Sequence, residues 1–334
     1  MTALVTGAGG FLGRHVIDLL VARGEQPRAL VRAGAQTAAL AEAGADVYSC
    51  DLGNGPLPRE VLRGVDRVLH CAARTGPWGP DDEYQRVNVT GLAALVHAAL
   101  EAGVRRFVHV SSITVHGNDV QGEADEDAPL RAEPNPYSRS KLAGERLLAR
   151  MIREQRAPVT IVRPGWIYGP RDNSSFARIA RRVESGHMVT LGSGTNHLPL
   201  IYVGDAARGI LLASESPQAE GRPYLLVNDE PVTQREFIGA LAGELGAPAP
   251  TRSLPYGLAL RLGAIAEARG RLARSPEPPP VTRYGVQLLG GENRFDISRA
   301  RRELGFSPQV SMAEGVRRSV DWYRSATAPN GGAR

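Results

Sequence analysis

Lysine is almost absent from this chain of 334 residues, because all but one of its 40 lysine and arginine residues are arginine. The single lysine is Lys141. Cysteine is also scarce, since Cys50 and Cys71 are too few for a disulfide framework or a zinc site of four ligands. The sequence therefore predicts no metal site, and the position of the one lysine becomes informative.

Long apolar runs and long basic runs are missing as well. No apolar segment approaches the roughly 18 to 20 residues that a membrane-spanning helix requires, so we expect no integral membrane span. Residues 2–6 lack the basic start of a secretion signal, which favours a cytoplasmic protein. The net charge of +5 comes from dispersed arginines without a basic stripe, so we expect no nucleic-acid partner.

Short apolar segments alternate with helical patterns through the first half of the chain. The predicted strands are residues 3–6, 28–31, 46–48, 67–70, 107–110 and 159–162. The predicted helices are residues 11–23, 35–44, 83–102 and 138–156. Strands this apolar are buried on both faces, so the alternation predicts an α/β fold, a doubly wound Rossmann sheet of about seven parallel strands.

Strands become sparse in the second half, where loops carry Gly, Pro and Ser. Strands are predicted at 200–203 and 224–227, and helices at 233–246, 254–270, 297–304 and 312–325. We predict a dinucleotide-binding domain of residues 1–165, completed by about 199–228. A smaller mixed α/β substrate domain would comprise 166–198 and 229–325, followed by a flexible tail at 326–334. Segment 254–270 has an apolar face that could pack in this domain, cover a pocket or touch a membrane.

Glycines follow the first predicted strand and lead into a helix. Gly7, Gly10 and Gly13 permit a tight turn and bring backbone N–H groups close to a pyrophosphate, with Phe11 and Leu12 opening the helix. Because this pattern lies in a predicted βαβ unit, it indicates a dinucleotide site.

The second predicted strand ends at Arg32, where an NAD site usually has an acidic residue for the ribose diol. An arginine there suits the additional 2′-phosphate of NADP. We therefore favour NADP(H), while NAD(H) remains possible.

Tyr137 and Lys141 are four residues apart and share one face of a predicted helix. An ammonium near the phenol would lower its pKa and make Tyr137 an acid/base group at neutral pH. The only lysine of the chain lies at this spacing, which favours function over a chance surface pair. Ser112 ends the strand at 107–110, where its hydroxyl could hydrogen-bond a substrate carbonyl.

An ordered set of motifs carries a resemblance that covers nearly the whole chain. It comprises residues 6–13, the strand end His70-Cys71-Ala72-Ala73, residues 110–117, Tyr137 with Lys141, and residues 163–170, 201–205, 295–298 and 304–306. Together they resemble the extended short-chain dehydrogenases/reductases, the NAD-dependent epimerase/dehydratase family. The resemblance implies catalytic Ser112, Tyr137 and Lys141. It further implies cofactor contacts by Asp51 and Leu52 beside the adenine, by Ala72, Ala73 and Thr75 along the cofactor, and by Pro164 and Ile167 near the nicotinamide.

Two positions favour an apolar substrate over a nucleotide sugar. The family's nucleotide-sugar enzymes carry an arginine where this chain has Leu198, and often an asparagine where it has Trp166. Segments 74–84, with Trp78 and Tyr84, and 279–283 resemble the 3β-hydroxysteroid dehydrogenase-like branch, which includes bacterial ketone reductases. We therefore predict substrate contacts by Trp78, Tyr84, Trp166 and Leu198.

The sequence thus predicts an oxidoreductase that interconverts a hydrophobic ketone and its secondary alcohol. A nucleotide-sugar epimerase or dehydratase with tightly bound NAD is the first alternative, and a non-catalytic dinucleotide sensor is the second. A homodimer is possible.

Overall fold

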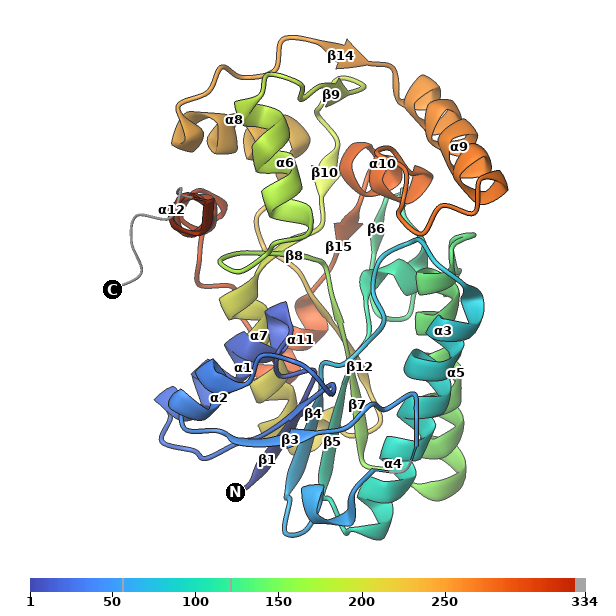
Figure 1. Cartoon of the computed structure of the whole chain (residues 1–334), viewed down its shortest axis with the longest axis vertical. Coiled ribbons are helices and arrows are strands. Elements are labelled where there is room, and N and C mark those ends of the chain that lie inside the picture. Colours follow the sequence, from blue (N-terminus) through green and yellow to red (C-terminus); the bar gives the residue numbers. More distant parts are fainter. Residues whose placement is uncertain (56, 121, 328–334) are drawn as a thin grey trace.

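The computed structural model describes residues 1–55, 57–120 and 122–327. At its centre is a sheet of seven parallel strands with helices on both faces (Figure 1). In chain order the strands are β1 (Ala3–Thr6), β2 (Arg28–Val31), β3 (Asp46–Ser49), β4 (Arg67–His70), β5 (Arg106–Val110), β7 (Val159–Pro164) and β12 (Pro223–Leu226). Across the sheet the order is β3-β2-β1-β4-β5-β7-β12. This order confirms the predicted doubly wound fold.

Two layers of helices cover the sheet. One layer comprises α1 (Phe11–Ala22), α2 (Ala38–Glu42), α7 (Val203–Glu215) and α11 (Ser298–Leu304). The other comprises α4 (Leu92–Glu101) and α5 (Pro136–Gln155). Successive strand residues point to opposite faces, so Val5 joins the first core and Leu4 the second. Both faces of the sheet are covered, so every residue of β1 and β4 is buried, and β1 is mostly apolar.

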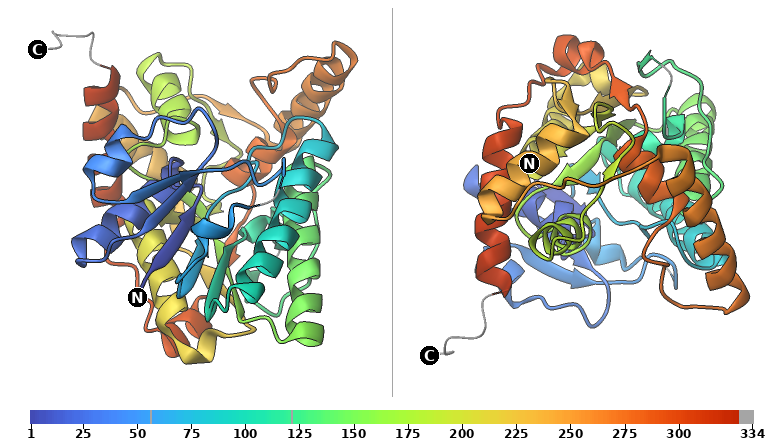
Figure 2. Two further views of the ribbon diagram at one scale, coloured as in Figure 1. Left: turned by 60° about the horizontal axis from the view of Figure 1, so that its bottom comes forward. Right: turned by 90° about the horizontal axis from the view of Figure 1, so that it is seen from above.

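The second half of the chain builds a smaller assembly over the carboxyl ends of the strands (Figures 1 and 2). Its core lies among α6 (Ser175–Glu184), α8 (Gln234–Leu245) and α12 (Met312–Thr327). Short strand pairs connect it: β8 (Trp166–Tyr168) with β11 (Leu200–Tyr202), β10 (His197–Leu198) with β13 (Val232–Thr233), β9 (Thr190–Leu191) with β14 (Ser253–Leu254), and β6 (Glu123–Ala124) with β15 (Arg294–Phe295). Helices α9 (Tyr256–Leu272) and α10 (Arg283–Gly290) pack together beside it.

Several elements differ from the sequence-based expectation. The strand predicted at 200–203 lies outside the central sheet and pairs with β8 as β11. The chain leaves β7 at Gly165, where the backbone passes so close to the Pro199 carbonyl that a Cβ would not fit. This close approach aligns β8 with β11. The helix predicted at 83–102 is divided into α3 (Asp81–Gln85), a π-helical turn (Arg86–Gly91) and α4. Helices α6 and α10 were not predicted.

Helix α12 continues to Thr327, so the predicted tail begins in a helix, and residues 328–334 lie outside the described part of the chain. Among the described residues, no helix is both long and apolar enough to cross a membrane.

Candidate active site

The turn between β1 and α1 leaves no room for side chains at two glycines. A Cβ on Gly7, where φ is 66°, would lie 2.7 Å from the backbone of Ala72, and one on Gly13 would lie 2.2 Å from the Gly7 carbonyl oxygen. Gly10 precedes α1 without a capping side chain. The first N–H groups of the helix, from Phe11 onward, therefore lack intrahelical acceptors and face an anion-binding position. This cradle of glycines fits a dinucleotide pyrophosphate.

The residues predicted for the adenosine side follow the neighbouring strands β2 and β3. Arg32 is exposed, and its carbonyl accepts a hydrogen bond from Ala35 N at 3.1 Å in the turn after β2. Asp51 and Leu52 follow β3 and are half-buried. The Asp51 carboxylate accepts from Gly53 N at 3.0 Å, so it orders its own turn.

The remaining predicted cofactor residues lie at the carboxyl ends of β4 and β7. Ala72 and Ala73 are half-buried and Thr75 is exposed, all in the loop that follows β4. Pro164 is buried at the end of β7, and Ile167 lies in β8 just beyond it. Together with the glycine turn, these residues surround the carboxyl ends of the strands, which form one edge of the sheet.

The three predicted catalytic residues come together at this edge. Ser112 is buried at the end of β5, and its hydroxyl is close enough to the Tyr137 phenol to lower the pKa of that phenol. Asn135 caps α5 by accepting from Ser138 N at 2.9 Å, which fixes where the catalytic helix begins. Lys141 Nζ lies 6.0 Å from the centre of the Tyr137 ring and donates to the Val110 carbonyl at 2.8 Å.

Burial controls the protonation of both groups on α5. Desolvation raises the pKa of Tyr137 to about 12, although the Ser112 hydroxyl opposes this shift. The direction is opposite to the one expected from the sequence, because the Lys141 ammonium is directed to a backbone carbonyl and desolvation of the phenol prevails. Desolvation also lowers the pKa of Lys141 to about 8, and the nearby Glu145 carboxylate opposes that change.

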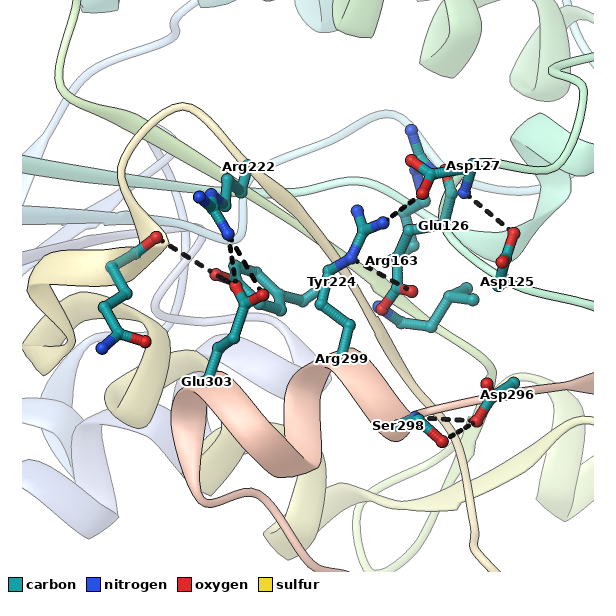
Figure 3. A network of polar contacts seen from close by, with 12 residues as sticks. Asp125, Glu126, Asp127, Arg163, Arg222, Tyr224, Asp296, Ser298, Arg299 and Glu303 are labelled. Carbon is teal, nitrogen blue, oxygen red and sulfur yellow. Dashed lines mark hydrogen bonds and ion pairs between the residues drawn. The ribbon is translucent and has the colours of Figure 1, made fainter.

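A buried ion pair supports the catalytic helix from the sheet. Glu145, one turn beyond Lys141, accepts from Arg163 Nη2 at 2.6 Å and from Ser111 Oγ at 2.5 Å. Arg163 Nη1 also donates to the Glu126 carbonyl at 2.9 Å. Figure 3 shows how this network extends through Glu126 toward Arg299 on α11, whose Nε lies 3.7 Å from the Glu126 carboxylate.

Two histidines lie buried beside Lys141. The rings of His70 and His109 stack with their centres 5.4 Å apart, and Thr6 Oγ1 hydrogen-bonds His70 Nδ1 at 2.7 Å. Neither ring nitrogen of His109 has a hydrogen-bond partner among the described residues. Burial lowers the pKa of His70 to about 3 and that of His109 in the same direction. Both rings are therefore neutral, and Lys141 carries the positive charge here.

The four predicted substrate residues occupy different environments. Trp78 is half-buried beside α9, where its Nε1 donates to the Ser275 carbonyl at 3.0 Å. Trp166 is half-buried against Phe237.

Tyr84 and Leu198 are buried and support the structure. The Tyr84 hydroxyl lies 2.7 Å from the Gly76 carbonyl oxygen and 2.8 Å from that of Trp78, so it holds the loop after β4 in place. Leu198 packs in the core of the second half, where β10 pairs with β13. Both side chains take part in packing, and their contact with substrate stays a prediction.

Sequence reasoning missed two residues of the site. Tyr284, on α10, places its ring edge-on to Tyr137 with 6.4 Å between ring centres. Asn88, in the π-helical turn, donates to Ser140 Oγ at 2.8 Å and to the Arg74 carbonyl at 2.9 Å. The only available signal for Tyr284 was its place directly after segment 279–283.

A cavity of about 390 Å³ lies at the far end of α10, roughly 9 Å along the helix from Tyr284. Asp119, Leu191, Ser193, Asn196, Tyr256 and Glu292 line it. The carboxylate of Asp119 accepts from Tyr256 Oη at 3.1 Å. Two carboxylates on its wall make this cavity unfavourable for a phosphate group.

Comparisons with known proteins agree with this geometry. The model of the "NAD dependent epimerase/dehydratase family" matches residues 3–226. A 2-alkyl-3-oxoalkanoate reductase of Stenotrophomonas maltophilia (strain K279a) is 33% identical over 327 residues, covering 95% of this chain and 98% of the relative. A 3-beta-hydroxysteroid dehydrogenase of Mycolicibacterium neoaurum is 28% identical over 335 residues, covering 96% of this chain and 90% of the relative.

Among solved structures, the UDP-glucuronic acid 4-epimerase of Bacillus cereus in complex with NAD superposes with a TM-score of 0.77. It is 24% identical, and the match covers 98% of this chain and 99% of the epimerase. At this identity the likeness supports the fold alone.

Proposed function

The chain belongs to the NAD-dependent epimerase/dehydratase family of extended short-chain dehydrogenases/reductases, and from this premise we propose that it interconverts a hydrophobic ketone and its secondary alcohol. The observation that carries the proposal is the meeting of Ser112, Tyr137 and Lys141 at the sheet edge that holds the glycine turn. A dinucleotide sensor would not need this complete acid/base set.

The side chains divide the chemistry among them. When bound, the nicotinamide supplies or accepts the hydride. In the reductive direction Tyr137 Oη donates a proton to the carbonyl oxygen, and the raised pKa keeps it protonated at neutral pH for this role. Ser112 Oγ hydrogen-bonds the same oxygen and orients it. The Lys141 ammonium stabilises the phenolate as it forms.

We propose that NADP(H) is the preferred cofactor. Arg32 is exposed at the end of β2, and no ion pair of its side chain is found within residues 1–55, 57–120 and 122–327. A guanidinium in this position is available for a 2′-phosphate.

The aromatic surroundings of the site support an apolar substrate. Tyr284 packs edge-on to Tyr137, and Trp78 and Trp166 are both partly exposed. The names of the two relatives above describe an alkyl-bearing oxoacid and a steroid as substrates. Apolar walls with a few directed polar groups are typical of sites for such molecules.

Charge in the second half of the chain argues against the nucleotide-sugar alternative. Leu198 is a core residue without a donor, and Asp119 and Glu292 line the neighbouring cavity. Arg171 pairs with Asp18 at 2.6 Å, so this cation is already engaged. A diphosphate buried here without cationic partners would be strongly disfavoured.

Two measurements on the cofactor-loaded protein test the proposal. Hydrophobic ketones and alcohols are screened by the absorbance of the reduced nicotinamide, with each cofactor in turn. Calorimetry with UDP then probes the alternative. We expect turnover of a polycyclic, aromatic or long-chain ketone and no binding of UDP. Micromolar UDP binding without turnover of any ketone would establish the epimerase alternative instead.

A further inference from the structure

Helix α9 buries mostly small residues and leaves several large apolar residues exposed. Its inner ridge is Ala259, Gly263 and Glu267, all buried. A Cβ on Gly263 would lie 3.0 Å from Arg283 N, so this ridge fits closely against the start of α10. A helix that only completes a protein core would place its leucines on this buried side.

The outer face of α9 carries a stripe of four exposed apolar side chains, with Arg269 between the last two. Leu258, Leu262, Ile265 and Leu272 are 46%, 45%, 50% and 88% exposed. Their spacing of four, three and seven residues places them on one side of the helix. Single exposed leucines are common, but an ordered row of four marks an interaction surface.

The charged residues on the outer face of α9 are all positive. Arg261 and Arg269 are exposed on the same side, and neither has an ion-pair partner among the described residues. The only acidic residue of α9 is Glu267, which is buried and accepts from Arg283 N at 2.7 Å. The outer face therefore combines leucines with unpaired arginines and has no carboxylate.

The stripe lies on the outside of the molecule and close to the active site. Figures 1 and 2 show α9 at a corner of the molecule, with α10 on its inner side. Arg271 of α9 lies over the Trp78 ring at 5.8 Å, and Tyr284 of α10 contacts Tyr137. A surface held by α9 would thus adjoin the aromatic wall of the site.

From these observations we propose that the outer face of α9 binds an anionic lipid surface. The helix would lie in the plane of the interface, with its leucines among the acyl chains and Arg261 and Arg269 at the lipid phosphates. The charge pattern selects this partner, because an apolar row accompanied on α9 by exposed arginines complements an anionic membrane. Docking is independent of the proposed reaction and would hold even if the substrate were different.

The test is flotation of the full-length protein with vesicles. Vesicles of phosphatidylcholine alone are compared with vesicles that contain about 30% phosphatidylglycerol. We expect binding to the anionic vesicles only, weakened at about 0.5 M salt. The triple variant L258S/L262S/I265S and the double variant R261E/R269E should each bind the anionic vesicles at least roughly tenfold more weakly than the unchanged protein.

Matched controls separate this face from general charge and apolarity. R146E/R150E changes the same net charge on α5, and L130S removes another exposed leucine; both should bind like the unchanged protein. Circular dichroism and the unfolding midpoint verify that each variant is folded.

Three outcomes would overturn the proposal. They are absence of binding to anionic vesicles, unchanged binding in the triple variant, and a dimer in light scattering that the triple variant dissociates. The last outcome would make the stripe a contact between two copies. Because vesicle binding needs no turnover, it can fail or succeed separately from the proposed reduction.

Discussion

The carboxylate of Glu145 and the guanidinium of Arg163 form a buried, doubly hydrogen-bonded pair between the catalytic helix and the sheet. Arg163 Nη2 lies 2.6 Å from Glu145 Oε2, and Arg163 Nε lies 3.0 Å from Oε1. Because Glu145 is four residues beyond Lys141 on α5, this pair fixes the face that carries the catalytic side chains. The acid/base residues thus depend on a contact that lies behind them.

Removal of Glu145 should therefore destabilise the fold. We expect Glu145→Ala to lower the free energy of unfolding by roughly 3–5 kcal/mol, because Arg163 would remain buried without its partner. Urea unfolding measures the change. In the control Glu154→Ala, which breaks the exposed pair with Arg153, the loss should stay within about 0.5 kcal/mol. Equal losses in the two variants would contradict this assignment.

Tyr137 should be essential for turnover. Tyr137→Phe keeps the ring but removes the proton, so kcat should fall by about 10²-fold or more while cofactor binding changes little. The measurement is steady-state turnover of a ketone identified in the screen. Tyr323→Phe, on the distant α12, removes a hydroxyl that bonds Glu184 and should keep turnover nearly normal. Near-normal activity of Tyr137→Phe would exclude it from the mechanism.

Arg32 should set the cofactor preference. The unchanged protein is expected to bind NADPH more tightly than NADH, and Arg32→Asp should reverse this order, with a change of about tenfold or more in the ratio. Fluorescence titration gives both dissociation constants. Arg63→Asp makes an equal charge change just before β4, at the amino end of that strand and so away from the carboxyl ends. It should leave the ratio of the two dissociation constants unaltered. Equal or tighter NADH binding by the unchanged protein would refute the argument.

Lys141 should leave a signature in the dependence of stability on pH. Burial lowers its pKa from 10.5 to about 8 in the folded protein. Between these values the unfolded chain binds the additional proton, so the Lys141 contribution makes stability rise with pH in this window. The cost of burying the charged Lys141 lowers the free energy of unfolding in full below about pH 8 and disappears above about pH 10.5. The free energy of unfolding therefore changes by roughly 3 kcal/mol across this window.

Lys141→Met, which has a similar length and no charge, isolates this contribution. The unfolding free energy of the unchanged protein minus that of this variant should increase as the pH rises from about 8 to 10. Chemical unfolding at several pH values gives the difference directly. A constant difference across the window would show that the folded-state pKa is not lowered.

The sequence by itself determined the doubly wound sheet, the glycine turn and the spacing of Tyr137 and Lys141. These features depend on local periodicity, on glycine at positions that exclude a Cβ, and on the four-residue repeat of a helix. They can be read along the chain because neighbouring residues specify them.

Only the tertiary structure decided which side chains face the site and how they are protonated. Tyr84 and Leu198 are buried and take part in packing, and Tyr284 reaches Tyr137 from a distant part of the chain. The pKa of Tyr137 rises where spacing to Lys141 predicted a fall. Both outcomes depend on the segments that surround a side chain and remove its water, and spacing along the chain carries no information about that desolvation.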